Sequence, residues 1–223
     1  GNNGGGIYVG NTGGATIQGN TIGLNATGTA ALGNTGVGIY VVTSSASTIG
    51  GDTTSARNII SGNSSHGVQL MSSAAHSVRG NYIGVGSDGT TLLGNGGAGV
   101  YIHANDTRIG GKASGEGNVI AGNAGAGIAV NSGVNNLFYR NSIHSNTGLG
   151  IDNDNDGVTA NDYNDGDGGA NYRNNFPVIT SVVTNGTTTT IQGSVDWFTG
   201  PDTLYVELFS SPSKDCLLYT SDA

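Results

Sequence analysis

The stretch TIQGNTIGLNATGTAALGNTGVGIYV, residues 16–41, returns as SVRGNYIGVGSDGTTLLGNGGAGVYI at residues 77–102. The two segments align without gaps and share 12 of their 26 positions. Agreement of this extent within one chain indicates an internal duplication with a period of about 61 residues. Repeats with a fixed period are typical of solenoids, in which each turn of the chain buries its apolar side chains against the next turn.

One period spans two coils, and the chain divides into five coils that each begin at a glycine. The starting glycines are Gly6, Gly38, Gly67, Gly99 and Gly127. In the shortest coil, residues 127–149, the apolar positions are Ile128, Val130, Phe138 and Ile143. The first two are spaced as on a strand, so both side chains are expected to point inward. The pattern predicts an all-β chain with three short strands in each coil.

Two columns of asparagine recur at fixed places once loop insertions are removed. The first column is Asn20, Asn58, Asn81, Asn118 and Asn141. The second column is Asn34, Asn63, Asn95, Asn123 and Asn146. Asparagine and glycine tolerate left-handed backbone angles at turns, and stacked asparagine side chains can hydrogen-bond along a stack. Both columns are therefore predicted to be structural ladders that join the coils.

Two kinds of insertion alternate along the chain. The first and third coils carry about nine extra residues near 24–32 and 85–93, and the second and fourth carry about six near 52–57 and 112–117. The 42 glycines argue against a helical solenoid, because each glycine inside a helix costs up to about 1 kcal/mol. Glycine does not recur at every third position, which excludes collagen.

The motifs GNxIG, GTxxLGN, GVxI, TIGG and NxISGN resemble the right-handed parallel β-helix repeats of bacterial secreted and surface proteins in the pectate-lyase-like superfamily. The resemblance covers residues 1 to about 175. It implies a right-handed, three-sided parallel β-helix of about five to six coils at an extracellular or cell-surface location. The superfamily does not share one activity, so the resemblance adds little about chemistry.

Four parts are expected along the chain. Residues 1–151 form the coils, residues 152–175 form a closing loop rich in Asp, Gly and Asn, and residues 176–213 begin a β-sandwich-like module. Residues 152–175 resemble the stretch that closes such β-helices in that superfamily, and residues 176–213 resemble the module that follows it. Residues 214–223, with the lone Cys216, resemble the translated adaptor sequence found at the ends of environmental gene fragments. The other interpretation is a genuine strand of the module.

The acidic composition argues against nucleic acid as a partner. The net charge is −8 and 10% of residues are charged, against about 25% in ordinary domains. An acidic chain with seven Lys plus Arg is a poor nucleic-acid binder. No apolar run is long enough to span a membrane, and one cysteine gives no disulfide framework. A monomer is expected.

Catalysis needs carboxylates that the coils scarcely provide. A glycosidase requires two carboxyl groups on either side of the substrate. Asp52 and Glu116 lie in equivalent insertions two coils apart, which places them about 10 Å apart, just beyond the inverting range. The motifs of polygalacturonases, Asn-Thr-Asp, Asp-Asp and Arg-Ile-Lys, are absent. The four histidines are expected in exposed turns; they are His66, His76, His103 and His144.

The Asp-rich run after the last coil is the best candidate for an ion site. Asp152, Asp154 and Asp156, followed by Gly157, match the first half of a D-x-D-x-D-G calcium loop. Tyr163 stands at the twelfth position, where such loops have a bidentate Glu, although Asp162 is adjacent. These four Asp residues are predicted to bind Ca²⁺, and the alternative is a solvated, Gly-rich loop.

A file of tyrosines is predicted on the outer face of the first strand of each coil. The position two residues after each starting glycine reads Tyr8, Tyr40, Gln69, Tyr101 and Ala129. Neighbours in the file should be about 4.8 Å apart. A flat file of this kind suits stacking on sugar rings, with Gln69 as a hydrogen-bond partner. Tyrosine is also simply a good strand residue, which is the alternative.

Two functions remain open from the sequence. The favoured one is a secreted or surface-displayed β-helical scaffold of the adhesin type that binds polysaccharide or a host surface through Tyr8, Tyr40, Gln69 and Tyr101. The alternative is a polysaccharide lyase or glycoside hydrolase whose active site lies outside these residues. The absence of a catalytic signature favours the scaffold.

Overall fold

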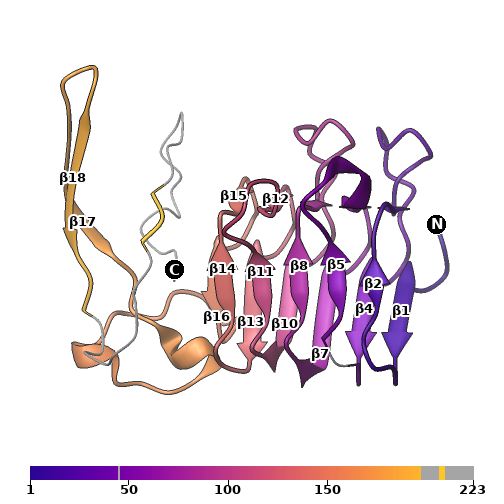
Figure 1. Cartoon of the computed structure of the whole chain (residues 1–223), viewed down its shortest axis with the longest axis horizontal. Helices are drawn as coiled ribbons and strands as arrows, with labels where there is room; N and C mark the ends of the chain where they lie inside the picture. Colours follow the sequence, from indigo (N-terminus) through magenta and orange to yellow (C-terminus); the bar gives the residue numbers. More distant parts are fainter. Residues whose placement is uncertain (45, 197–205, 209–223) are drawn as a thin grey trace.

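The computed structural model describes residues 1–44, 46–196 and 206–208. Its strands stack along one axis into three parallel sheets (Figure 1). Sheet A consists of β1 (Ile7–Gly10), β4 (Ile39–Val42), β7 (Val68–Ala74), β10 (Val100–Asn105), β13 (Ile128–Ser132) and β16 (Ile151–Asn153). Sheet B consists of β2 (Thr16–Ile17), β5 (Thr48–Gly50), β8 (Ser77–Arg79), β11 (Arg108–Gly110) and β14 (Leu137–Tyr139). Sheet C consists of β3 (Thr21–Ile22), β6 (Ile59–Ile60), β9 (Tyr82–Ile83), β12 (Val119–Ala121) and β15 (Ser142–His144).

Each strand pairs with the equivalent strand of the next coil. In sheet A, Ile39 of β4 lies beside Val68 of β7, and Val68 lies beside Val100 of β10. The same one-coil step relates neighbouring strands in sheets B and C. The fold is therefore a three-sided parallel β-helix, which confirms the predicted all-β class and the three strands per coil.

The core runs along the inside of the three sheets. Ile128 and Val130 are fully buried, as their strand spacing predicts. Phe138 and Ile143 pack against the same core but are only half-buried. Their strands, β14 and β15, are the last of sheets B and C, so one side of each lacks a covering strand among the described residues.

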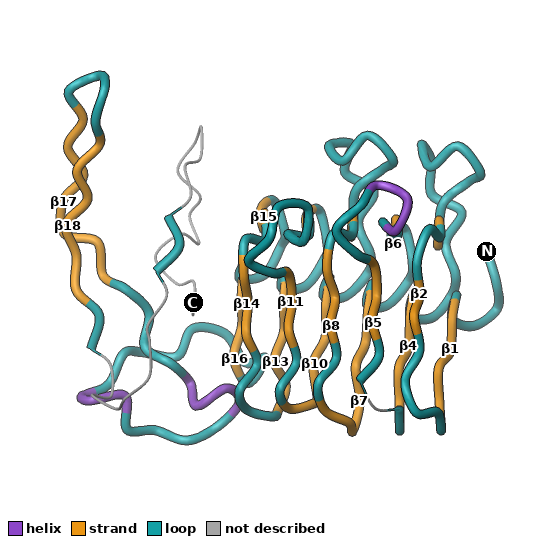
Figure 2. The backbone as a smooth tube through the Cα atoms, viewed as in Figure 1, coloured by secondary structure: helices purple, strands orange, loops and turns teal. Residues whose placement is uncertain are grey.

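The longer insertions leave the stack as two neighbouring loops (Figure 2). Each is pinched at its base by an antiparallel bridge, Leu24 with Ala31 in one and Val85 with Leu92 in the other. The loops come from coils one and three, yet the Ser87 amide donates to the Gly28 carbonyl at 2.9 Å. Loops that are two coils apart in the sequence therefore contact each other across the coil between them. The shorter insertion of coil two holds a 3₁₀ turn, η1 (Thr54–Ala56).

The chain after β16 is irregular. Residues 154–177 contain the turns η2 (Tyr163–Asp165) and η3 (Ala170–Arg173) and no strand. β17 (Val178–Thr184) and β18 (Thr189–Ser194) then form one antiparallel hairpin, drawn beyond the end of the stack in Figure 2. The β-sandwich-like module stays a prediction, and residues 214–223 with Cys216 lie outside the described residues. Within the described ranges, no helix is long and apolar enough to cross a membrane.

Candidate functional site

Both asparagine columns form continuous hydrogen-bonded ladders. The Asn118 side-chain oxygen accepts from the amide of Asn81 at 2.9 Å and from its Nδ2 at 3.0 Å. Asn118 Nδ2 donates to Asn141 Oδ1 at 2.9 Å and to the Val78 carbonyl at 2.8 Å. The second column repeats this arrangement, for example from Asn95 to Asn123. The ladders fix the spacing of the coils and make the stack a rigid frame for its outer faces.

A third buried polar column joins the coils between sheets A and B. Its members are Ser47, His76, Thr107, Asn136 and Asn171. The Ser47 amide donates to His76 Nδ1 at 3.2 Å, and the Thr107 amide donates to Asn136 Oδ1 at 3.0 Å. The Asn136 amide donates to Oδ1 of Asn171, in η3, at 2.8 Å, so the closing segment supplies the last member. The column was not predicted because its residue types differ; the signal was a polar residue eight or nine positions after the starting glycines of coils two to five.

Three of the four histidines are not the exposed turn residues that the sequence predicts. His103 is half-buried on β10. His76 is fully buried in the third column, where its ring nitrogen replaces the amide oxygen of an asparagine. His66 is half-buried, and its Nδ1 accepts from the Ala98 amide at 3.0 Å. Burial lowers the pKa of His66 and His76, which keeps both imidazoles neutral at pH 7.

The four residues of the predicted sugar file lie side by side on sheet A. Tyr8 pairs with Tyr40, Tyr40 with Gln69, and Gln69 with Tyr101. Tyr8 is 67% exposed, and the other three are half-buried. The file is not flat, because the rings of Tyr8 and Tyr40 meet edge to face at 65° with centroids 5.7 Å apart. Aromatic rings prefer this geometry, since the positive edge of one meets the negative face of the other.

Tyr101 has an aromatic partner that the file alone did not predict. The His66 ring stacks on it at 29°, with centroids 4.6 Å apart. Burial raises the pKa of Tyr101, so its hydroxyl stays protonated. A neutral imidazole and a neutral phenol thus form a second, nearly parallel aromatic surface at this end of the file.

The file ends after Tyr101. Ala129, its next neighbour in the register, is fully buried and packs with Ala98 and Ala126 beside the Tyr101 ring. Asp152 follows in the same register and is also buried, with its carboxylate accepting from the Gly157 amide at 3.3 Å. The accessible part of the file therefore extends over Tyr8, Tyr40, Gln69 and Tyr101.

The structure does not bring the predicted calcium ligands together. Asp152 lies on the outer face of sheet A, and burial raises the pKa of its carboxyl group. Asp154 instead forms an ion pair with Arg173 and accepts from the Ala170 amide at 2.8 Å. Asp162 accepts from the Gly166 amide at 3.1 Å. No group of three or more His, Cys, Asp or Glu residues is placed to hold a metal ion within the described ranges.

A cation of the protein itself occupies part of this acidic segment. The Arg173 guanidinium lies against Asp154, and its Nη1 is 4.0 Å from Asp167 Oδ2. Burial alone would raise the pKa of Asp154, but the Ala170 amide and Arg173 hold it below its usual value. Calcium binding by Asp152, Asp154, Asp156 and Asp162 stays a prediction, and the ion would have to displace Arg173.

Of the two carboxylates considered for catalysis, Asp52 is exposed and Glu116 has structural partners. Asp88, in the insertion of coil three, is also held by contacts within its loop. Glu116 forms a 2.6 Å ion pair with Arg79 and accepts from the Ala113 amide at 3.0 Å. Asp88 caps its own loop by accepting from the Thr91 hydroxyl at 2.6 Å and from the amides of Thr91 and Thr90, and these hydrogen bonds lower the pKa of its carboxyl group. These contacts hold the insertions in place.

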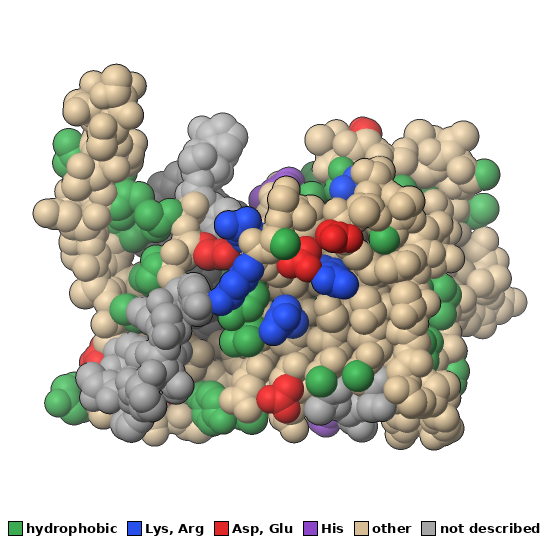
Figure 3. All heavy atoms as spheres, viewed as in Figure 1, with side chains coloured by type: hydrophobic (Ala, Val, Ile, Leu, Met, Phe, Trp, Pro, Cys, Tyr) green, Lys and Arg blue, Asp and Glu red, His purple; other side chains and the backbone are tan. Residues whose placement is uncertain are grey.

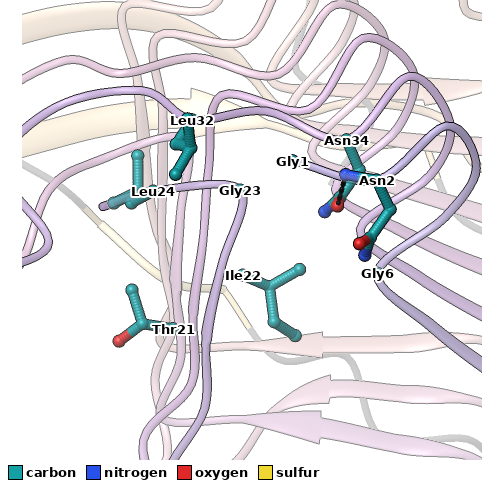
Figure 4. A pocket seen from close by; sticks show the side chains of 9 residues that line it. All are labelled: Gly1, Asn2, Gly6, Thr21, Ile22, Gly23, Leu24, Leu32 and Asn34. Carbon is teal, nitrogen blue, oxygen red and sulfur yellow. Dashed lines mark hydrogen bonds between the residues drawn. The ribbon is translucent and has the colours of Figure 1, made fainter. Parts of the chain in front are cut away.

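One hollow lies at the first coil, and Figure 4 shows the side chains around it. Its lining residues are Gly1, Asn2, Gly6, Thr21, Ile22, Gly23, Leu24, Leu32 and Asn34. The Asn2 amide donates to Asn34 Oδ1 at 3.0 Å across it. None of these side chains can transfer a proton near neutral pH, so the hollow offers no acid–base chemistry.

These features define the molecule as a three-sided parallel β-helix with asparagine ladders and an aromatic file on one face. Comparison of the chain with models of protein families, with curated proteins and with solved structures gives no match.

Proposed function

We propose that this protein is a rigid β-helical scaffold of the pectate-lyase-like type that works outside the cell or on its surface. Its outer sheet A face would bind a polysaccharide, either free or displayed on another cell. The single observation that carries the proposal is the unbroken register of Tyr8, Tyr40, Gln69 and Tyr101 on one sheet. The resemblance of the repeat motifs supports the pectate-lyase-like type and a location outside the cell or on its surface.

Rigidity is the first requirement of such a site. Each coil is tied to the next by its strands and by hydrogen bonds in the two asparagine columns, so the spacing of the file is set before a ligand arrives. Preorganised side chains lose little conformational entropy on binding, which raises the affinity of a given set of contacts.

The chemistry of the file favours neutral sugars. Its members carry phenol and amide groups, and the neighbouring His66 is kept neutral by burial. The one acid in the register, Asp152, is buried at its end. The edge-to-face Tyr8–Tyr40 pair and the stacked His66–Tyr101 pair offer two separate aromatic contacts, with Gln69 between them as a hydrogen-bonding group.

A catalytic function has no comparable support among the described residues. The carboxylate of Glu116 is paired with Arg79, and the Asp-rich segment contains an ion pair where a metal was expected.

Binding to neutral polysaccharides tests the proposal. Affinity for dextran, soluble cellulose derivatives and mannan would be measured with the unaltered chain and with Tyr8→Ala. Loss of one sugar–aromatic contact of roughly 1.4 kcal/mol should weaken binding about tenfold. Tyr163→Ala removes a tyrosine that is 90% exposed in the closing segment and should leave affinity unchanged. Equal effects of both substitutions, or no binding to any neutral glycan, would reject sheet A as the site.

A further inference from the structure

The outer face of sheet A carries a second row of residues beside the tyrosine file. Two residues after each member of the file, the register aligns Gly10 with Val42, Val42 with Met71, and Met71 with His103. Residues two apart on a strand lie on the same face, about 7 Å from each other. All four positions are half-buried. We call Gly10, Val42, Met71 and His103 the second row.

The first coil contributes an aromatic ring to the second row, although its own residue there is a glycine. A Cβ atom on Gly10 would lie only 2.7 Å from the Tyr8 ring, which is too close for both to be accommodated. The ring therefore lies over Gly10, and the missing side chain leaves the room that it occupies. Because Gly10 is aligned with Val42, the Tyr8 ring fills the second row in register with an apolar side chain.

Tyr40 is consequently surrounded by groups of three different kinds. On the side of the first coil, the Tyr8 ring meets Tyr40 edge to face. On the side of the third coil, the Gln69 carboxamide is its register neighbour, about one coil spacing of 4.8 Å away. Val42 lies two residues further along the same strand, β4. We call Tyr8, Tyr40, Val42 and Gln69 the Tyr40 site.

The file and the second row are composed of uncharged residue types and histidine. None of the residues in the two rows is Lys, Arg, Asp or Glu. Charged side chains of the coils occur on sheet B, where Arg79 ends β8 and Arg108 begins β11. Figure 3 shows Lys and Arg side chains beside acidic side chains near the middle of the viewed face. The residue types of the two rows thus favour a ligand without charge.

We infer that the Tyr40 site binds the acetamido group of an N-acetylhexosamine, so that the preferred ligand is a neutral glycan of N-acetylated sugars. The inference rests on the proposed binding of polysaccharide by sheet A. An acetamido group joins an amide to a methyl group. The amide can donate to or accept from the Gln69 carboxamide, and the methyl group packs against Val42 and the Tyr8 ring.

The same contacts discriminate against an unmodified hexose. A sugar hydroxyl in place of the acetamido group could still bond to Gln69, but it would leave Val42 and the Tyr8 ring without an apolar partner. The acetylated sugar additionally removes its methyl group from water, which is favourable. The Tyr40 ring contacts the C–H groups of either sugar equally, so it contributes affinity without distinguishing between them.

Two tetrasaccharides of the same linkage test this inference. The tetramer of N-acetylglucosamine carries an acetamido group where the tetramer of glucose from cellulose carries a hydroxyl. Calorimetric titration should show about tenfold tighter binding of the acetylated tetramer. Equal affinities would overturn the inference and leave the proposed polysaccharide site intact. If neither tetramer binds, the inference fails, and the proposed function fails with it only if dextran and mannan also do not bind.

The tetramer of glucosamine, with free amino groups, identifies the part of the substituent that is recognised. It should bind no more tightly than the glucose tetramer, because it lacks the methyl group and the amide. Binding as tight as that of the acetylated tetramer would show recognition of a nitrogen substituent alone and would overturn the inference.

Val42→Thr and Gln69→Met separate the apolar contact from the hydrogen bond. The first keeps the shape of the side chain and replaces a methyl group with a hydroxyl, and the second keeps its length and removes the amide. Each should reduce the tenfold preference to about threefold. Val119→Thr makes the first substitution at a half-buried position of β12 in sheet C and should leave the preference unchanged. An undiminished preference in both sheet A variants would contradict the assignment, and thermal unfolding verifies that all three variants fold.

Discussion

The coils and the segment that closes them use Asn and Asp residues in different ways. Each inner ladder asparagine, such as Asn118, bonds to its equivalents on both sides, so one pattern satisfies all the inner members. In residues 152–175 the contacts are individual except at Asn171 in the third column: Asn175 donates to the carbonyls of Asp162 and Asp196, and Asp154 pairs with Arg173. The comparison teaches that the coils are stabilised by repetition, whereas the closing segment depends on a few separate contacts.

Buried polar atoms are left without hydrogen-bond partners where the coils meet the closing segment. Asn136 Nδ2 and Asn153 Oδ1 are buried and have no hydrogen-bond partner among the described residues. An unpaired buried polar group costs about 1–3 kcal/mol. We therefore expect the closing segment to open before the coils.

The largest expected effect is the loss of a ladder member. Asn118→Ala leaves the amide and Nδ2 of Asn81 without their acceptor, so it should destabilise the protein by about 1–3 kcal/mol. Asn58→Ala should act similarly. Asn25→Ala, in an exposed insertion, removes the acceptor of the Thr29 and Ala30 amides and should destabilise the protein less. Chemical denaturation measures all three, and equal losses would show that the ladders contribute no more than a loop contact.

A smaller effect is expected on the pH dependence of stability, through His76 in the third column. Burial lowers the pKa of folded His76, so the unfolded chain binds the proton more readily. The contribution of His76 is thus complete above the ordinary histidine pKa of about 6.5 and decreases as the pH falls below it. His76→Asn should reduce this acid-side loss of stability, while His144→Asn, at an exposed position, should not. Melting temperatures from pH 8 to pH 5 supply the comparison.

A local effect is expected in the closing segment. Arg173→Gln removes the cation that holds Asp154 and Asp167, so residues 152–175 should be cleaved faster by protease. The midpoint of coil unfolding should change little, because each coil is held by its own strands and ladders. A drop in that midpoint as large as the one caused by Asn118→Ala would contradict the separation of the two regions.

The smallest expected effect concerns calcium. Without Arg173, Asp154 and Asp167 lose their cation. If Asp152, Asp154, Asp156 and Asp162 bind Ca²⁺, millimolar Ca²⁺ should partly restore protease resistance to Arg173→Gln. Mg²⁺ should do so less well, because it demands a smaller and more regular set of oxygen ligands. Equal resistance with and without Ca²⁺ would leave the solvated loop as the interpretation of this segment.

Repetition explains which parts of the structure could be predicted from the sequence. The identical residues of the columns, such as Asn58 and Asn81, mark their positions directly. The strand spacing of Ile128 and Val130 likewise places both inside the coil, because side chains alternate across a strand. The register that aligns Tyr40 with Tyr101 followed from the same offsets.

The remaining features depend on contacts that no offset encodes. The third column escaped detection because Ser47, His76 and Asn136 differ in type although their hydrogen-bonding role is shared. The edge-to-face Tyr8–Tyr40 pair depends on side-chain rotamers, and the pairing of Asp154 with Arg173 joins residues 19 positions apart in an irregular segment. Such contacts are decided by packing rather than by local sequence.

Native-state hydrogen exchange tests the contrast between the two regions most directly. The amides of Asn81 and Asn118 donate to the next asparagine of their ladder, and the amides of Gly157 and Gly166 donate to single Asp side chains in the closing segment. The ladder amides should exchange only on global unfolding, and those of Gly157 and Gly166 through a local opening of lower free energy. Equal protection of both sets would contradict the view that repetition, rather than individual contacts, stabilises this fold.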